Sequence, residues 1–217
     1  MPTTLLLVPT DLERRLLAPA LAAGMAATDR LECCGFGVVA AAARTAALLA
    51  EHAADRVLLV GIAGRLDGSL AIGAAYRFAR VACHGVGAGS GAAFVPAAAL
   101  GWPQWPGDRT AAAVGDLIEL SAAHEGDARG GGLLLTACAA SATADDVTDR
   151  LALFPAATAE DMEGFGVALA CRLHGVPLAI VRGISNDAGN RDHTRWQVQP
   201  ALVAAADLAL RILEEPT

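Results

Sequence analysis

Short apolar runs alternate along the chain with alanine-rich stretches that carry polar residues at helical spacing. The apolar runs predict strands, and the alanine-rich stretches predict helices. Strands are expected at 4–8, 31–36, 56–60, 133–137 and 178–184, with one or two more within 71–82. Helices are expected at about 10–24, 40–54, 145–154, 162–173 and 200–214.

This alternation predicts an α/β fold with three αβα layers and a central mixed, largely parallel sheet, covered by helices on both faces. The length of 217 residues suits a single domain over 1–217. In such sheets ligands bind beyond the carboxyl ends of the strands. We therefore expect the site in the loops after Val8, Val60, Ala137 and Ile184.

Composition narrows the class of partner. The formal charge of -7, without a basic run, argues against a nucleic-acid surface. The first residues have no basic segment of the kind that begins a signal peptide, and no apolar stretch is long enough to span a membrane. The five cysteines form no C-x-x-C pair, which favours buried free thiols in a reducing compartment. We expect a cytoplasmic protein that binds neither membranes nor nucleic acids.

No cofactor or metal is expected. The glycine cluster at 85–91 lacks G-K-[ST] and fails the G-x-G-x-x-G spacing, so tight turns explain it better than a phosphate-binding loop. The five histidines are scattered without metal-ligand spacing. The loop-rich segment 85–127, which carries Trp102 and Trp105, is expected to form a flap or an oligomer contact.

Two motifs carry the candidate chemistry. E-D-M-E-G at 160–164 places carboxylates where a helix begins, and V-R-G-I-S-N-D at 181–187 places Arg182 inside an apolar strand. A buried arginine is costly unless it is paired, and Glu163 is the expected partner. The residues alone leave open whether this pair is a structural salt bridge or part of a site.

The same motifs resemble a known family. M-E-G followed by V-R-x-I-S-[DN] is similar to the purine nucleoside phosphorylase and methylthioadenosine nucleosidase superfamily, as are G-x-G-x-x-x-A at 35–41 and G-x-A-G at 61–64. Ala74 stands where that family usually has aspartate. R-G-I-S-N, then G-x-R-D at 189–192 and Trp196, resembles the futalosine hydrolase branch more closely.

The resemblance implies an N-ribosyl hydrolase that cleaves futalosine to hypoxanthine and dehypoxanthine futalosine in menaquinone biosynthesis. The alternatives within the family are a methylthioadenosine or aminofutalosine nucleosidase and a purine nucleoside phosphorylase. Ile62 stands where phosphorylases and nucleosidases often have serine, which favours water as the acceptor. Family members are usually homo-oligomers, so a dimer or tetramer is expected. A non-catalytic nucleoside sensor is the alternative of a different class.

The resemblance also implies roles for catalytic residues. Glu163 is expected to accept hydrogen bonds from the ribose hydroxyls and to stabilise an oxocarbenium-like sugar. Glu13 is expected to orient the attacking water, although Thr10-x-x-Glu13 is also a capping box, and Asp11 is the second choice. Arg182 is expected to help hold the water and Glu163. Asn186 is expected to read the edge of an oxopurine, because an amide both donates and accepts.

Further residues are expected to bind the substrate. Met162 is expected against the sugar and Trp196 over the purine, although core packing would also suit Trp196. Arg191 and Arg195 are candidates for a carboxylate on the 5′ substituent. Two groups complete the predicted substrate-binding set: Ile62, Ala63 and Gly64 after the third strand, and Asp187, whose position also suits a loop carboxylate.

Overall fold

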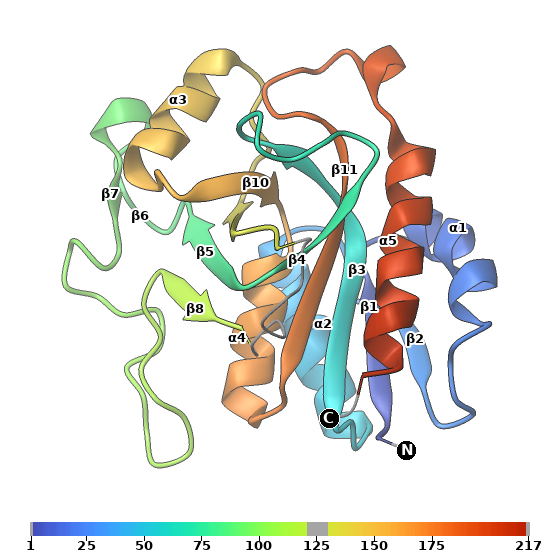
Figure 1. The fold of residues 1–217 in the computed structure, drawn as a ribbon. Coiled ribbons are helices and arrows are strands. Elements are labelled where there is room, and N and C mark those ends of the chain that lie inside the picture. Colours follow the sequence, from blue (N-terminus) through green and yellow to red (C-terminus); the bar gives the residue numbers. More distant parts are fainter. Residues whose placement is uncertain (1, 121–129, 216–217) are drawn as a thin grey trace.

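The computed structural model describes residues 2–120 and 130–215 of the chain. Within these residues, nine strands form one mixed sheet (Figure 1), and two short strands pair separately. The strands of the large sheet are β1 (Thr4–Val8), β2 (Arg30–Cys33), β3 (Arg56–Arg65), β4 (Ala75–Phe78), β5 (Arg80–His84), β8 (Leu117–Glu119), β9 (Leu133–Ala137), β10 (Ala157–Asp161) and β11 (Leu178–Asp187). The separate pair is β6 (Gly87–Ala88) with β7 (Val95–Pro96).

Most of the pairings in the sheet are parallel. Strand β1 lies between β2 and β3, β3 continues to β11, and β9 lies between β10 and β5, all in parallel. Antiparallel pairs join β4 to β11, β10 to β3, and β8 to β5. All five residues of β1 and all five of β9 are buried, as is usual for parallel strands covered on both faces.

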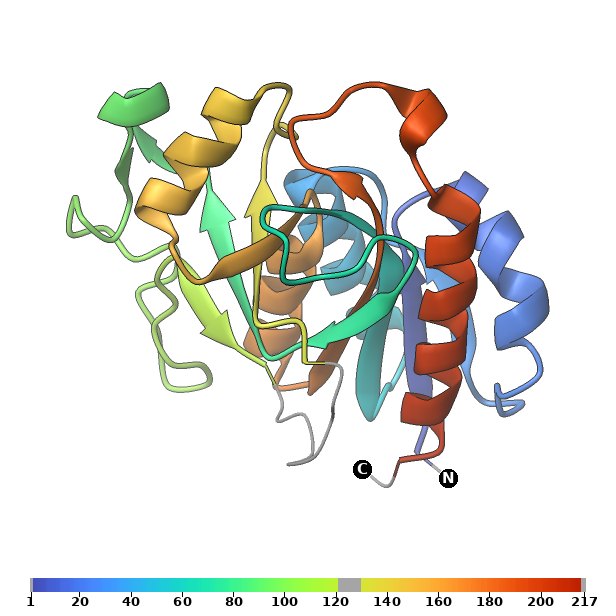
Figure 2. The same cartoon turned by 45° about the horizontal axis from the view of Figure 1, so that its top comes forward.

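Helices cover both faces of the sheet (Figures 1 and 2). Helix α2 (Val38–Glu51) packs with α4 (Gly164–His174) over one apolar core, and α1 (Asp11–Leu21) packs with α5 (Val198–Leu213) over a second. A third, smaller core lies under α3 (Ala144–Leu153). Two single turns of 3-10 helix lie at Gly91–Ala93 and His193–Arg195. The predicted three-layer fold with a largely parallel sheet is confirmed.

Several boundaries differ from the sequence prediction, and three of the differences lie at the site. Strand β3 was expected to end at Val60, but it runs through the glycines to Arg65, because β11 pairs alongside it from Leu178 to Asp187. Strand β10 was not predicted. Helix α4 begins at Gly164 rather than Met162, since the chain leaves β10 at Asp161 and bends before the helix starts.

The loop-rich segment is partly ordered into the β6–β7 hairpin and strand β8, and its residues 121–127 lie outside the described part of the chain. Positive φ angles at Gly85, Gly89 and Gly91 agree with the predicted tight turns. Among the described helices, none combines the length and hydropathy that a membrane span requires.

The approach of α5 to β11 depends on Gly183. A Cβ atom added there would overlap the backbone of Ala201, in the first turns of α5. Overpacking of this kind typically costs about 1–3 kcal/mol. We therefore expect Gly183→Ala to lower the free energy of unfolding by at least that amount, measured by denaturant titration.

Gly68→Ala is the matched control, because an added Cβ there meets nothing within 4 Å. Equal stability of the two variants would contradict the packing described here.

Candidate active site

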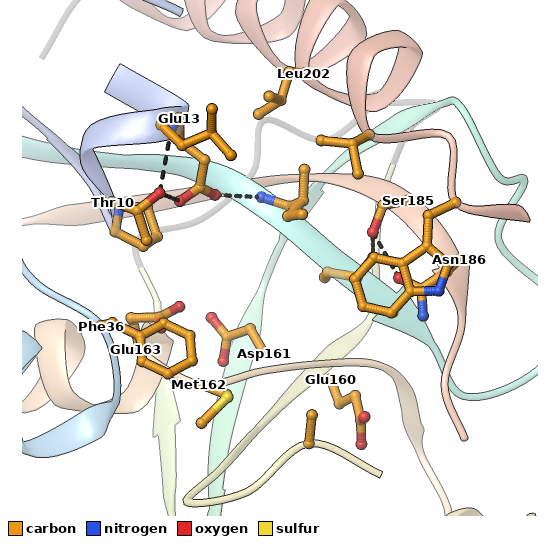
Figure 3. Close-up of a pocket in the computed structure, with 18 of the residues that line it drawn as sticks. Thr10, Glu13, Phe36, Glu160, Asp161, Met162, Glu163, Ser185, Asn186 and Leu202 are labelled. Atoms are coloured by element: carbon orange, nitrogen blue, oxygen red, sulfur yellow. Dashed lines mark hydrogen bonds between the residues drawn. The ribbon is translucent and has the colours of Figure 1, made fainter. Parts of the chain in front are cut away.

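A cavity of about 320 Å³ opens at the end of the sheet where β3, β10 and β11 finish (Figure 3). Its volume lies at the lower end of the roughly 300–1,000 Å³ typical of small-molecule sites. Most of the predicted site residues line it: Glu13, Ile62, Ala63, Gly64, Met162, Glu163, Asn186, Arg191 and Trp196. Residues from α1, β3, the turn between β10 and α4, β11 and the loop before α5 thus meet at one place.

Arg182 lies beneath this cavity and is fully buried. Its Nε and Nη2 donate to Asp161 Oδ2 at 3.1 and 2.6 Å, while Nη2 lies 3.5 Å from Glu163 Oε2. The expected partner, Glu163, is therefore the more distant of two carboxylates, and Asp161 is the nearer one. A buried cation held by two carboxylates fixes the position of both.

Asp161 also organises the start of α4. Its Oδ2 accepts a hydrogen bond from the backbone N of Gly164, and its Oδ1 accepts one from the hydroxyl of Thr136. Thr136 in turn accepts from the backbone N of Phe165. These two side chains satisfy N–H groups that a helix start otherwise leaves without partners.

Glu163 occupies the N-cap position of α4, but its side chain makes no hydrogen bond to its own helix. Its Oε1 accepts from the backbone N of Gly37 at 3.1 Å, and only 4% of the residue is exposed. Burial raises the pKa of this carboxyl to about 7; Arg182 opposes the shift, and the charge of Asp161 adds to it. The group therefore changes its charge near neutral pH.

Glu13 has two functions in the structure. Thr10 donates to its Oε2 at 2.7 Å and caps α1, while Oε1 accepts from the backbone N of Ile62 at 3.2 Å. Thr10 therefore caps α1, but Glu13 accepts from the Thr10 hydroxyl rather than from its backbone N, so half of the expected capping box is present together with the placement in the cavity. Asp11, the second choice for the same role, is exposed, pairs with Arg14 at 3.0 Å, and does not line the cavity.

Gly61 leaves space between Glu13 and Arg182. A Cβ atom at this glycine would lie 2.8 Å from Glu13 Oε1 and would overlap Arg182 Nη1. That Nη1 is buried and has no hydrogen-bond partner among the described residues. The absence of a side chain at Gly61 therefore lets the Glu13 carboxylate and the Arg182 guanidinium both come close to this point of β3.

Asn186 lies on the other side of the cavity from Glu13 and Glu163 (Figure 3). Its Oδ1 accepts from the hydroxyl of Ser185 at 2.7 Å, and its Nδ2 donates to the backbone O of Asp187 at 2.8 Å. An amide can make further bonds through its second N–H and its remaining lone pair. Asn186 can therefore present both a donor and an acceptor to a ligand.

Asp187, which was predicted to bind substrate, does not line this cavity. Its Oδ1 accepts from Arg65 Nε at 2.5 Å, and half of its side chain is exposed. Asp187 and Arg195 line a separate cavity of about 350 Å³, which shares Asn186 and Trp196 with the first.

The mouth of the cavity carries positive charge around an indole ring. The ring of His193 stacks on Trp196 at 4.3 Å, and the Arg191 guanidinium lies 5.2 Å from the Trp196 ring centroid. Trp196 Nε1 donates to the backbone O of Asn190, which fixes the ring. Both Arg191 and His193 line the cavity, so an anion at its mouth would meet two basic side chains.

Several lining residues were not predicted, namely Thr10, Phe36, Ser141, Glu160, Asp161, Ser185 and His193. Glu160 and Asp161 belong to the same acidic run as Glu163, and that run was the available signal. Their pairing with distant residues could not be found without the fold. No group of three or more potential metal ligands lies together in residues 2–120 and 130–215.

The central ion pair gives a stability prediction. Asp161→Ala would leave Arg182 buried beside a single, more distant carboxylate. Breaking a buried pair in this way typically costs about 3–5 kcal/mol. We expect a loss of that size in the free energy of unfolding. Asp11→Ala breaks the exposed pair with Arg14, and we expect about 0–1 kcal/mol. A similar small loss in both variants would show that Arg182 does not depend on Asp161.

Comparison with known proteins identifies the family of the chain. The family model described as "Phosphorylase superfamily" matches residues 30–215. The chain is similar to the futalosine hydrolases of Streptomyces coelicolor, at 34% identity over 80% of this chain and 73% of the relative, and of Thermus thermophilus, at 34% identity over 83% and 79%. It is 31% identical to a 5′-methylthioadenosine/S-adenosylhomocysteine nucleosidase of Colwellia psychrerythraea, over 82% of this chain and 76% of the relative.

Solved structures share the fold. The nucleosidase of Neisseria meningitidis, in complex with methylthio-immucillin-A, superposes with a TM-score of 0.77 at 21% identity and covers 99% of both chains. The futalosine hydrolase of Helicobacter pylori superposes with a TM-score of 0.76 at 17% identity, over 99% of this chain and 98% of that one. Given the family match over residues 30–215 and the relatives at 34% identity, this chain belongs to the phosphorylase superfamily.

Proposed function

We propose that this protein is an N-ribosyl hydrolase that cleaves futalosine and releases hypoxanthine. One observation carries the proposal: the Glu163 carboxylate and the Asn186 amide line opposite sides of a single cavity. A nucleoside that spans the cavity would place its sugar near the first and its base near the second. The relatives named futalosine hydrolase support the choice of substrate.

Glu163 serves the sugar in this mechanism. Cleavage of the bond between ribose and base passes through an oxocarbenium-like sugar, which a nearby carboxylate stabilises. The same carboxylate accepts hydrogen bonds from the ribose hydroxyls, and charge-assisted bonds of this type are worth about 1.5–3 kcal/mol. Met162, one residue earlier, would contact the sugar ring.

Glu13 and Arg182 hold the attacking water in this mechanism. A carboxylate oxygen of Glu13 and the unpaired Nη1 of Arg182 both lie close to Gly61. A water that bridges these two groups would donate to Glu13 and accept from Arg182, and Glu13 would take its proton as the bond to the sugar forms. A general base of this kind contributes about 10²–10⁴-fold to the rate.

Asn186 serves the leaving base. Its free N–H and lone pair can bond to the edge of a 6-oxopurine as negative charge builds up on the ring. Ser185 keeps the amide in place through the hydrogen bond to Oδ1.

The charges in the cavity favour water over phosphate as the acceptor. Carboxylates of Glu13, Asp161 and Glu163 surround the sugar side, and like charges would repel a phosphate anion there. Arg14 and Arg44 pair with Asp11 and Glu51 and do not line the cavity. A phosphorylase therefore fits the site less well than a hydrolase.

The mouth of the cavity suits an acidic 5′ substituent. Arg191 can bind a carboxylate through two parallel N–H groups, and His193 lies beside it. This feature favours futalosine, which ends in a carboxylate, over methylthioadenosine, which does not. The nucleosidase relative supports methylthioadenosine as the second candidate substrate. Aminofutalosine is a further candidate.

A homo-oligomer in the cytoplasm is part of the same proposal. Leu12 and Phe36 line the cavity yet are 56% and 66% exposed. A second copy of the chain that covered them would close the cavity from water. A step in menaquinone biosynthesis follows from the substrate.

Base release from four nucleosides tests the proposal. We expect release from futalosine to be fastest, compared with aminofutalosine, inosine and methylthioadenosine, and to be the same with and without phosphate. Chromatography of the products measures both. Strict dependence on phosphate would contradict hydrolysis, and preference for methylthioadenosine would contradict the choice of substrate.

The pKa of Glu163 predicts a pH profile. Burial raises this pKa to about 7, and only the ionised form can stabilise a cationic sugar, so activity requires a pH above that value. We expect kcat/KM to fall about tenfold per pH unit below pH 7, because kcat/KM reports groups of the free enzyme.

Glu163→Gln is the companion variant. We expect it to lower kcat by about 10²–10³-fold, the usual cost of losing one electrostatic contact to the transition state. Its remaining activity should lack the fall below pH 7. Persistence of that fall in the variant would assign it to another group.

A further inference from the structure

A second buried polar cluster forms part of the cavity wall and has no role in the mechanism above. Glu160, at the end of β10, accepts from the backbone N of Ser141 through Oε1 at 2.8 Å and from the Ser141 hydroxyl through Oε2 at 2.7 Å. Arg150 of α3 donates to Glu160 Oε2, to the Ser141 hydroxyl and to the backbone O of Ala139. Glu160, Ser141 and Arg150 are 5%, 1% and 7% exposed.

This ion pair presents only its negative partner to the cavity. Glu160 and Ser141 line the cavity, whereas Arg150 lies behind them and does not. A carboxylate has about four acceptor positions, and the three donors from Ser141 and Arg150 occupy three of them. One acceptor position remains on Oε1. An unpaired acceptor in a buried place costs free energy. A hydrogen bond from a ligand to this position of Oε1 would therefore stabilise the complex.

The cluster lies opposite Glu13 across the cavity. Figure 3 shows Asp161 and Met162 between Glu160 and Glu163. Glu160 and Asn186 come from the ends of β10 and β11 and line the same cavity. A base that contacts Asn186 along one edge would present its six-membered ring to the wall formed by Glu160 and Ser141.

We infer that Glu160 determines the choice of base by accepting a hydrogen bond from the ring N–H of a 6-oxopurine. The inference rests on the proposed function, since it takes the ligand to be a purine nucleoside. In a 6-oxopurine the ring nitrogen next to the oxo group carries a hydrogen, whereas in adenine the same nitrogen is an acceptor and would face a carboxylate lone pair. Asn186 can donate or accept and so discriminates less on its own.

Binding of free bases to the unmodified protein gives the first test. Calorimetric titration with hypoxanthine, adenine and 1-methylhypoxanthine separates the ring N–H from the rest of the base. We expect hypoxanthine to bind at least tenfold more tightly than either of the others. Equal affinity for hypoxanthine and 1-methylhypoxanthine would overturn the inference, because the methyl group removes the ring N–H.

The variant Glu160→Gln gives the second test. An amide at this position puts an N–H where the free acceptor was, so we expect hypoxanthine to bind at least tenfold more weakly and adenine to bind equally well or better. Ser141→Ala is the matched control, since it loosens the same wall and leaves the Glu160 acceptor in place. We expect it to weaken both bases alike.

The controls distinguish a loss of base recognition by Glu160 from a general disruption of the cavity wall. Equal weakening of both bases in Glu160→Gln would assign Glu160 a purely structural role and overturn the inference. Thermal unfolding checks that each variant is folded. If Glu160→Gln does not fold, the titration of the unmodified protein with the three bases decides whether Glu160 accepts the ring N–H.

Base binding does not require turnover, so the two proposals can fail separately. Selective binding of hypoxanthine by a protein that releases no base from futalosine would contradict the proposed hydrolysis alone. Hydrolysis of futalosine without selectivity among the free bases would contradict the role of Glu160 alone.

Discussion

The structure depends above all on one buried cation. Arg182 enters the sheet in the middle of β11, where water cannot reach it, and charge in such a place requires charge of the opposite sign. Asp161 and Glu163 supply it from the turn between β10 and α4, and Glu13 faces the same guanidinium from α1. Three elements from distant parts of the sequence are therefore held in register around one side chain. The cavity above it has its shape because of that constraint.

The fold was largely predictable from the sequence because most of its elements carry strong local signals. Strand β1 and strand β9 are unbroken apolar runs, and α4 ends at Gly175, whose φ of 68° suits a left-handed helix end. The misjudged elements lacked such signals. Strand β10 reads A-T-A-E-D, which is too polar and too rich in alanine to look like a strand. Gly61 and Gly64 resembled a loop because the pairing of β3 with β11 is not visible in the sequence.

The candidate site was predictable where a motif places chemically distinctive residues close together. Glu163, Arg182 and Asn186 stand in two short runs, and the fold brings both runs to one cavity or directly beneath it. Partners separated by long stretches of chain were not predictable. Nothing in the sequence links Asp161 to Thr136, or Glu160 to Arg150, since these contacts arise from strand pairing and helix packing. Asp187 lies outside this cavity and pairs with Arg65, a contact that the sequence does not reveal.

The way α4 begins has a consequence for the carboxylate that opens it. The side chain of an N-cap residue usually accepts a hydrogen bond from a backbone N–H in the first turn of its own helix. Here Asp161 and Thr136, which lie on neighbouring strands, accept the hydrogen bonds of the first turn. The carboxylate oxygens of Glu163 are therefore available for other partners. It also stays at the positive end of the helix dipole, which favours a negative charge at that point. Neighbouring side chains therefore stabilise the start of α4, and the carboxylate of Glu163 remains free to contact a ligand in the cavity.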